Sequence, residues 1–359
     1  MLSWIKLRFI KKYRIKKHYN AASVINQKQP FYKPFILILP SLLTILLFTL
    51  IPFILVIMDA FLIQRNSFNA GNLELSHGNF VKLFGGTFTS DGVTQTYEAD
   101  KWFVAGVRNS IIYAIVALPI SLVISLLISS AIANVLRKKL RGFFQTIFFI
   151  PYVTSGIAVS VTFYFLFDTQ NGFINQLIDK KIPIPWLTSG ETSSFYAFVV
   201  ILIRGVWGNL AFQILLLTTA MLSVNPSLYK AASIDGSHKL QQFFSITLPS
   251  IKRTVSFLIT IGIIGGIKIF PLALFNNNAL EGFHNGGSSI MLYIFYFVRE
   301  DVHLAAAASL VLFVLGVFIS FTLRRLVTIT YNISINLGVK NVSNKIMNKR
   351  KVSKKIFSF

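Results

Sequence analysis

Six long apolar stretches, separated by polar segments, set the pattern of this chain. A helix needs about 20 apolar residues to cross the roughly 30 Å hydrocarbon core of a bilayer, and each stretch is long enough to cross once. The fourth crossing is expected to begin near residue 195, ahead of Arg204. The pattern predicts six transmembrane helices: the charge-free stretches 34–58, 109–136, 142–167, 205–229 and 302–323, and the stretch 254–280, which is interrupted only by Lys268.

A seventh apolar segment, Ser288 to Val298, is only 11 residues long. At 1.5 Å of rise per residue it is too short to cross a bilayer. It is predicted to form an interfacial or re-entrant helix on the outer side of the membrane.

The distribution of charge predicts the orientation. The two terminal segments, the short loop at 137–141 and the loop at 224–253 together hold 26 Lys and Arg residues and one acid, Asp235. The opposite loops, 65–108, 168–193 and 279–301, hold seven cations and ten acids. Loops rich in Lys and Arg face the cytoplasm. Both tails are therefore predicted to be cytoplasmic, as an even number of crossings also requires.

Composition excludes several classes of protein. Hydrophobic residues make up 54% of the 359 residues and charged residues only 13%, about half the charged share of a soluble domain. The net charge of +23 comes from cations that lie between apolar runs, not on a polar surface as in a nucleic-acid-binding protein. There is no cysteine, which excludes disulfides, thiolate metal sites and a cysteine nucleophile. The first apolar run is too long for a signal peptide and is expected to be a retained helix.

The most informative polar segment is the predicted cytoplasmic loop Asn225–Pro249. Asn225 is a favourable helix cap and Pro226 suits the first helical position. Asp235 and Gly236 form a stop and turn. A second helix is predicted from the apolar spacing that follows, and Pro249 is expected to end it; the apolar positions are Leu240, Phe243, Phe244, Thr247 and Leu248.

These two short helices have two possible roles. The adjacent alanines, Ala231 and Ala232, leave a low surface that another protein can approach closely. Alternatively, the helices are a connector packed against their own bundle. The physics of the residues leaves both roles open.

The spacing of this loop resembles the EAA coupling motif of permease subunits in binding-protein-dependent ABC importers. That motif reads E-A-A-x-x-D-G-A-x-x-x-x-x-F-x-x-I-x-L-P. Eight positions match without insertion or deletion: Ala231, Ala232, Asp235, Gly236, Phe243, Ile246, Leu248 and Pro249. The resemblance covers about residues 35–329. Within this range the chain is most similar to the first of the two permeases in carbohydrate and glycerol-phosphate importers. The segments that carry the similarity are Phe35–Pro52, Arg141–Tyr152, Trp207 with Pro226, and Ala305–Ala308.

The resemblance implies an all-α membrane protein, a type I ABC importer permease (MetI-like) bundle of six transmembrane helices. Four regions follow from it: a basic tail at 1–34, the first helix and outer loop at 35–108, the permease core at 109–329 and a basic tail at 330–359. The tails are also expected to make weak contacts with anionic membrane lipid.

The implied partners are a second permease subunit, two ABC ATPase subunits and an extracellular binding protein that delivers a sugar or oligosaccharide. The implied ATPase-coupling residues are Lys230, Ala231, Ala232, Asp235, Gly236, Phe243, Leu248 and Pro249. No G-x-x-x-x-G-K-[ST] phosphate loop occurs in the chain. ATP would therefore be hydrolysed by the partner, and no cofactor is expected on this chain.

Two departures from the family pattern matter. Lys230 stands where the motif has glutamate, so a groove built for a carboxylate would accept it poorly. The Gly-Gly-Pro stretch usual after the fifth helix is replaced by residues 276–282. Asp235 is the single acid on the predicted cytoplasmic side. It either caps the second helix near Ser237 or pairs with a basic group, and that group could belong to the ATPase.

Charges inside the predicted crossings identify candidates for the transport path, because such charges usually face the bundle interior or water. Arg204 and Lys268 could bind anionic or hydroxyl-rich groups of a substrate. Alternatively, Arg204 snorkels or pairs with the second permease, and the role of Lys268 is equally open. In related permeases the fourth and fifth helices line the sugar path, which implies Trp207, Gly208, Asn209 and Phe212 as well.

Other classes of function have less support. The five histidines are scattered without metal-ligand spacing, and no G-x-S-x-G elbow appears, so neither a metal site nor a membrane hydrolase is expected. An ion-coupled carrier would commonly show acids in mid-membrane, whereas here the acids lie almost entirely in the predicted outer loops. A permease of the same architecture that imports glycerol-phosphate or another polar solute remains the alternative.

Overall fold

The computed structural model describes residues 32–64, 73–90, 93–178, 182–322 and 325. The chain divides into two compact units, Met1–Leu55 and Val56–Phe359, and each is described by itself. Apart from positions 32–34, the two predicted basic tails lie outside the described residues.

The first predicted crossing is a helix with one wide turn in its middle. α2 (Tyr32–Ile45) leads into the π-helix η1 (Leu46–Leu50), and α3 (Ile51–Ala60) follows without a gap. The backbone N–H of Ile51 donates to the carbonyl of Leu46, five residues earlier. Pro52 comes next, and its ring would clash with the carbonyl four residues before it in a regular helix. The wider turn lets the helix continue past this proline.

Two short hairpins and a helix connect the first and second crossings. β1 (Leu62–Gln64) pairs antiparallel with β2 (Leu73–Leu75), and β3 (Gly86–Ser90) pairs antiparallel with β4 (Val93–Tyr97). Between the hairpins lies α4 (Gly78–Phe84). The buried side chain of Asn79 donates to the carbonyls of Ala60, at 3.1 Å, and Leu62, at 2.8 Å. These bonds fix α4 to the end of α3.

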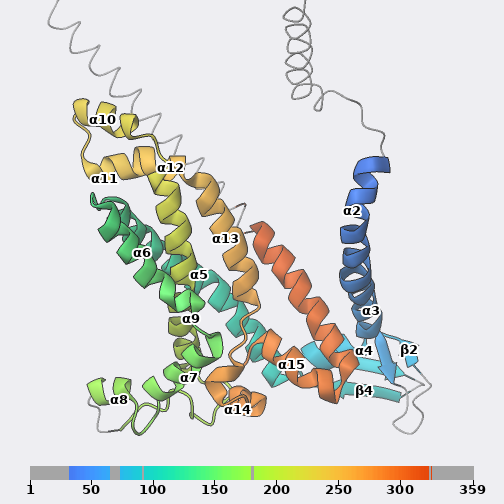
Figure 1. The fold of residues 1–359 in the computed structure, drawn as a ribbon. Helices are drawn as coiled ribbons and strands as arrows, with labels where there is room; N and C mark the ends of the chain where they lie inside the picture. The colour runs from blue at the N-terminus through green and yellow to red at the C-terminus, as the bar shows by residue number, and fades with distance from the viewer. Residues whose placement is uncertain (1–31, 65–72, 91–92, 179–181, 323–324, 326–359) are drawn as a thin grey trace, which may run out of the picture. The chain divides into compact units, whose positions relative to one another are not determined.

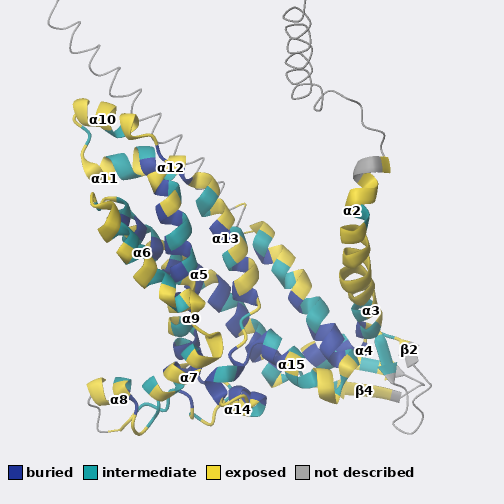
Figure 2. Ribbon diagram, viewed as in Figure 1, coloured by how far each residue is buried: buried dark blue, intermediate teal, exposed yellow. Residues whose placement is uncertain are grey.

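The centre of the second unit is built on two long helices, α5 (Lys101–Ala133) and α9 (Tyr196–Leu222), which pack along each other. α13 (Lys252–Ile267) packs against both. The last helix, Val302–Thr322, buries the alanines from Ala305 to Ala308. Buried positions line the facing sides of these helices, and their outward sides are exposed (Figure 2). The apolar outward sides suit a helix in contact with lipid.

The third predicted crossing is not one straight helix. α6 (Lys138–Val153) and α7 (Gly156–Leu166) meet at a bend of 89°. Pro151 lies in the last turn of α6, and Thr154 is extended, so the helix cannot propagate into Gly156. The prediction of one continuous helix over 142–167 is therefore wrong. Including this bent pair as one span, the described residues contain up to six membrane-length apolar spans; without it they contain five.

A compact cap closes the end of the bundle that also carries α4 (Figure 1). Beyond α7 the chain forms α8 (Phe173–Ile178), and beyond α13 it forms η3 (Leu272–Phe275), α14 (Ala279–His284) and α15 (Ile290–Glu300). α15 packs on α5 and is not among the membrane-length spans. The prediction of a short, non-crossing helix near 288–298 is confirmed.

Long-range hydrogen bonds hold this cap to α5. The buried amide of Asn109 donates to the carbonyls of Gly286, at 3.1 Å, and Ser288, at 2.9 Å. A Cβ atom on Gly106 would lie 2.9 Å from the backbone of Ser289, so the two backbones meet because residue 106 has no side chain. The segment before α15 is thus fixed to α5 on two successive turns.

Asp100 and Asp301 complete the cap. The Asp100 carboxylate caps α5 by accepting from the backbone N–H of Trp102 and also accepts from the Tyr293 hydroxyl at 2.8 Å. Burial, followed by the charge of Asp100 and its hydrogen bond, raises the pKa of the Tyr293 hydroxyl. Asp301 caps the last helix and lies 3.8 Å from the Lys82 ammonium of α4. Each of the two carboxylates thus joins a helix start to a second element.

Candidate functional site

The loop that resembles the coupling motif forms two helices at the opposite end of the second unit (Figure 1). The first is α10 (Pro226–Ile234), and the Asn225 side chain caps it by accepting from the N–H of Ser227 at 3.0 Å. The second consists of α11 (Lys239–Gln242), the π-helix η2 (Phe243–Thr247) and α12 (Leu248–Ser250). The prediction of two short helices is confirmed.

The corner between these helices is a Schellman motif centred on Gly236. The N–H of Gly236 donates to Ser233, and the N–H of Ser237 donates to Ala232, the two bonds that define the motif. Gly236 has φ +77°, and no atom would lie within 4 Å of a Cβ placed there. The glycine is needed for its backbone conformation, not for lack of space.

One of the two roles left open for Asp235 is excluded, and the prediction that Pro249 ends the second helix is wrong. The cap of the second helix is His238, whose ring accepts from the N–H of Gln241 at 3.2 Å, and not Asp235, because the Schellman turn places Asp235 at the C-terminal cap of α10. Pro249 does not end the second helix, which runs to Ser250. As at Pro52, a π-turn lies just before the proline, and the N–H of Leu248 donates to the carbonyl of Phe243.

One side of the second helix is packed against the bundle. Phe243 and Ile246 pack against a cluster at the ends of α9 and α13 that includes Leu217 and Met221. The hydroxyl groups of Tyr229, on α10, and Thr247, on η2, lie 2.8 Å apart. These contacts hold the two helices to each other and to the bundle.

The other side of the two helices is exposed and apolar. Ile234 is 87% exposed, Leu240 65%, Phe244 60% and Leu228 47%. Of the matched motif positions, Ala231, Asp235, Gly236 and Pro249 are exposed, as is Lys230; Ala232, Phe243, Ile246 and Leu248 are half-buried. No residue of α10 is buried. Several large apolar side chains exposed together are typical of a site that contacts another protein or a membrane.

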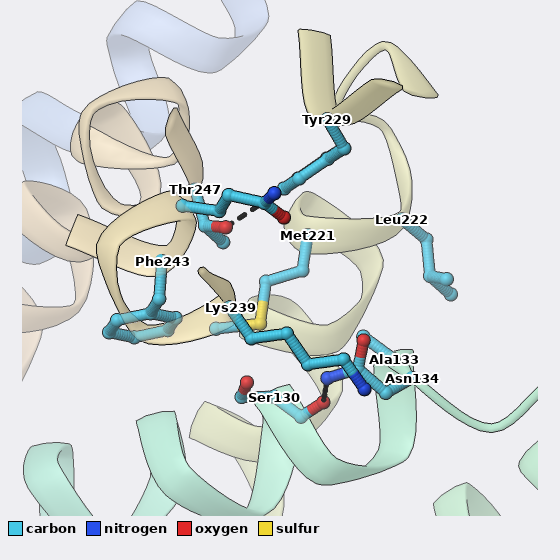
Figure 3. A pocket seen from close by; sticks show the side chains of 10 residues that line it. Ser130, Ala133, Asn134, Met221, Leu222, Tyr229, Lys239, Phe243 and Thr247 are labelled. Carbon is cyan, nitrogen blue, oxygen red and sulfur yellow. Dashed lines mark hydrogen bonds between the residues drawn. The ribbon is translucent and has the colours of Figure 1, made fainter. Parts of the chain in front are cut away.

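A groove of about 270 Å³ lies between the α10–α12 helices and the ends of α5 and α9. Figure 3 shows the Lys239 side chain extending across it toward Asn134 of the turn after α5. Both polar and apolar side chains line the groove: Ser130, Ala133, Asn134, Met221, Leu222, Tyr229, Lys239, Gln242, Phe243 and Thr247.

Arg204, a candidate for the transport path, is bonded within the chain. Its guanidinium donates to the carbonyl of Gly156 at 3.1 Å, in the first turn of α7, just after the bend from α6. Tyr113 of α5 faces both Arg204 and Asn209. The arginine therefore satisfies a backbone carbonyl at the broken third crossing, a role that the sequence did not reveal.

The other α9 candidates share a more exposed environment. Gly208 and Asn209 are exposed, and Trp207 is 38% exposed, with its ring centroid 6.1 Å from that of Phe163 on α7. The ring of Phe212 stacks on Tyr152 of α6 at 5.7 Å. The structure thus brings the α9 candidates together beside the bend between α6 and α7.

Lys268 belongs to a different helix from that group. It is the residue at which α13 ends, and it is exposed. A cation is favourable at this position because the last carbonyls of a helix carry partial negative charge.

A buried polar contact between α5 and α9 was missed by the sequence analysis. Gln213 accepts from the Ser125 hydroxyl at 2.9 Å and donates to the Ser121 hydroxyl at 3.1 Å, and Ser129 donates to the Ile214 carbonyl. The spacing of the three serines, one every four residues, is a signal that could have identified this interface. Within the described part of the chain, no group of three or more metal-ligating side chains is gathered.

The described residues form a bundle of membrane-length helices with an exposed pair of short helices at one end. No protein-family model matches the chain, but individual relatives do.

The chain is 45% identical over 318 residues to the "Probable ABC transporter permease protein MG188" of Mycoplasma genitalium, across 88% of this chain and 92% of that protein. It is 27% identical over 230 residues to the lactose transport system permease protein LacF of Rhizobium radiobacter, across 62% of this chain and 75% of that protein. This chain belongs to the ABC transporter permeases.

A solved structure shares the fold. It is a bacterial alginate ABC transporter in complex with an alginate pentasaccharide-bound periplasmic protein, and one of its chains matches with a TM-score of 0.61 at 20% identity. The match covers 86% of this chain and 95% of that chain. The mostly helical architecture predicted from the apolar pattern is therefore confirmed.

Proposed function

We propose that this chain is one permease subunit of an ATP-driven importer and that it translocates a carbohydrate delivered by an extracellular binding protein. A second permease would complete the membrane path. Two ABC ATPase subunits would supply the energy by hydrolysing ATP, and no cofactor would bind to this chain. Both termini and the α10–α12 helices would face the cytoplasm, in agreement with the excess of Lys and Arg in those segments.

The observation that carries the coupling role is the exposed apolar side of α10 and α11. Ile234 and Leu240 flank the Gly236 corner with exposed fractions of 87% and 65%, and apolar surface of this kind is typical of protein interfaces. The opposite side packs against the bundle, where Tyr229, Phe243 and Ile246 contact the cluster that contains Leu217 and Met221. A push on the exposed side would therefore pass as rigid-body motion to α9 and α13.

Carbohydrate as the substrate class is supported by the relatives, because the lactose permease and the alginate transporter both carry saccharides by name. The side chains beside the α6–α7 bend also suit a sugar. Trp207 and Phe212 offer aromatic faces, and Asn209 offers both a donor and an acceptor. Lys268 is the exposed candidate for an anionic group, since Arg204 is already bonded to Gly156.

The first test is purification of the tagged chain from its native membrane in a gentle detergent, with identification of every co-purifying subunit. An ATPase and a second permease are the expected partners. The variant Gly236→Pro should release the ATPase, because proline cannot adopt φ +77° and cannot donate to Ser233. Gly236→Asn is the matched control, since asparagine tolerates the left-handed conformation.

Recovery of the chain alone, under conditions that keep a known importer intact, would contradict the proposal and favour an autonomous carrier. The substrate class has its own test in the same membranes. Uptake of labelled oligosaccharides should depend on ATP, whereas uptake of glycerol-phosphate in their place would identify the alternative solute.

A further inference from the structure

Lys230 is the one position of the coupling motif at which the sign of the charge is reversed. It lies in the middle of α10, one residue before Ala231, and it is exposed. Large apolar side chains, Leu228 and Ile234, are exposed on the same short helix. The inference drawn from this position rests on the proposed function.

Docking would remove the Lys230 ammonium from water. When a protein covers the exposed apolar side of α10, a cation beside that side loses part of its hydration, which is costly unless a counter-charge replaces it. Ala231 has only a methyl group, so it cannot hold a partner away from the cation. The complex therefore needs a carboxylate close to Lys230.

The chain does not supply that carboxylate. Among the described residues, no ion pair involves Lys230. Asp235 is the only acid between positions 192 and 280, and the neighbouring loop at 134–141 contains cations and no acid. Asp235 itself lies at the C-terminal cap of α10, more than one helical turn beyond Lys230. The coupling end of the molecule is thus cationic and nearly free of its own counter-charges.

We propose that the partner ATPase presents an aspartate or glutamate to Lys230 in the cleft that receives α10. The pair has the opposite polarity to one built around the glutamate of the usual motif. Such a pair selects the partner: an ATPase whose cleft carries a cation at this place would meet like charge and be rejected. Lys230 is then a determinant of which ATPase can drive this permease.

Carbodiimide cross-linking of the purified complex tests the contact directly. A carbodiimide joins a lysine amine to an adjacent carboxylate as an amide, and the carbodiimide takes up the water that is lost. Peptide mapping should find Lys230 joined to an acidic residue of the co-purified ATPase. Lys230→Arg keeps the charge but has no reactive amine, so this cross-link should disappear while the amount of ATPase recovered stays the same.

Charge reversal tests the energetics. Lys230→Glu should lower the amount of ATPase recovered by at least about tenfold, because it places two carboxylates together in a desolvated contact. Lys239→Glu is the matched control, with the same charge change in the same loop. Its side chain lines the groove beside α5 (Figure 3), and its effect should be less than about twofold.

The cross-linked acid then gives a rescue experiment. Replacing it with lysine in the ATPase should weaken binding to the wild-type permease and restore binding to the Lys230→Glu variant. The inference is overturned if Lys230→Glu retains the ATPase as well as the wild type does, or if Lys230 cross-links to no ATPase residue. Absence of any ATPase with the wild-type chain would instead overturn the proposed function itself.

Discussion

The two ends of the second unit are built on opposite principles. At the cap end, Asn109, Asp100 and Tyr293 are bonded across long stretches of sequence, and Phe283 is fully buried. At the end that carries α10, α11 and α12, no residue of α10 is buried. The same helices, α5 and α9, run between these ends, so the difference lies in what is attached to them.

The difference indicates that one end contributes to the stability of the fold and that the other offers a surface for contact with another protein. The polar groups of the cap form bonds within the chain, whereas α10 and α11 expose large apolar side chains, and Lys230 has no ion pair among the described residues. Under the proposed function, a helix pair held to the bundle on one side would transmit a push while the cap stays fixed. Substitutions in the cap should therefore lower the free energy of unfolding more than matched substitutions in α10–α12.

The largest effect is expected from the aromatic core of the cap. Phe283→Ala removes a ring that is 0% exposed and stacks on Trp102 at a centroid distance of 4.9 Å. Loss of a buried phenylalanine lowers the free energy of unfolding by about 3–5 kcal/mol. The matched change at the other end, Phe244→Ala, removes a ring that is 60% exposed and should cost less than about 0.5 kcal/mol in the isolated chain. Denaturant unfolding in detergent measures both, and equal losses would contradict the comparison.

The second effect concerns two buried carbonyls. Asn109→Ala leaves the carbonyls of Gly286 and Ser288 without their donor, which should cost about 2–4 kcal/mol. Asn134→Ala removes a single exposed bond to Ser130 and serves as the control, with a loss below about 0.5 kcal/mol. Thermal unfolding of both purified variants decides the matter. A loss at Asn109 no larger than that at Asn134 would show that the cap is not held as described.

The third effect depends on pH. Tyr293→Phe removes the hydroxyl bonded to Asp100 and should cost about 1–3 kcal/mol at neutral pH. Because the folded protein raises the pKa of Tyr293 above its unfolded value of about 10, the neutral hydroxyl stabilises the fold fully below pH ~10. That contribution is lost as the pH rises through the folded pKa.

The wild type should therefore lose stability above pH ~10 more steeply than Tyr293→Phe does. Melting temperatures measured from pH 8 to 11 provide the test. Tyr196→Phe, which alters a tyrosine 46% exposed, is the control and should follow the wild-type curve. Parallel curves for the wild type and Tyr293→Phe would argue against the link.

The smallest loss of stability is expected for a substitution in the middle of the bundle, between the two ends. Ser125→Ala removes the bond to Gln213, and bonds between membrane helices contribute about 0.6 kcal/mol on average. Ser245→Ala, which removes an exposed bond to Gln241 on the coupling helix, should show no measurable loss. A Ser125→Ala loss as large as that of Asn109→Ala would remove the distinction between the cap and the middle of the bundle.

Much of the fold follows from the apolar runs because lipid requires long, uninterrupted apolar helices. The run over 142–167 predicts one helix because hydropathy does not show where a helix axis bends. The bend depends on Pro151 and the extended Thr154. The short segment before Val298 was read correctly, because its length alone excludes a crossing. Pro249 was misread because a π-turn, which leaves no mark in the apolar pattern, lets the helix continue.

For the site, local motifs were more informative than single charges. The spacing around Gly236 identified the corner and both helices, since turn chemistry is local. Arg204 looked available because its acceptor, Gly156, lies 48 positions away in the sequence. The contact of Gln213 was missed for the same reason, because its partners are serines on α5. Long-range partners of polar residues need the three-dimensional structure.

The bonds of Asn109 also set an order of assembly during synthesis. Its acceptor at Gly286 lies 177 residues later in the chain, which at about 5–20 residues per second corresponds to about 10–35 s of translation. The contact from Ser125 to Gln213 spans only 88 residues and can form in roughly half that time. The two central helices can therefore pair before the cap has been synthesised, and Asn109 can bond to its acceptors only after the ribosome has added them.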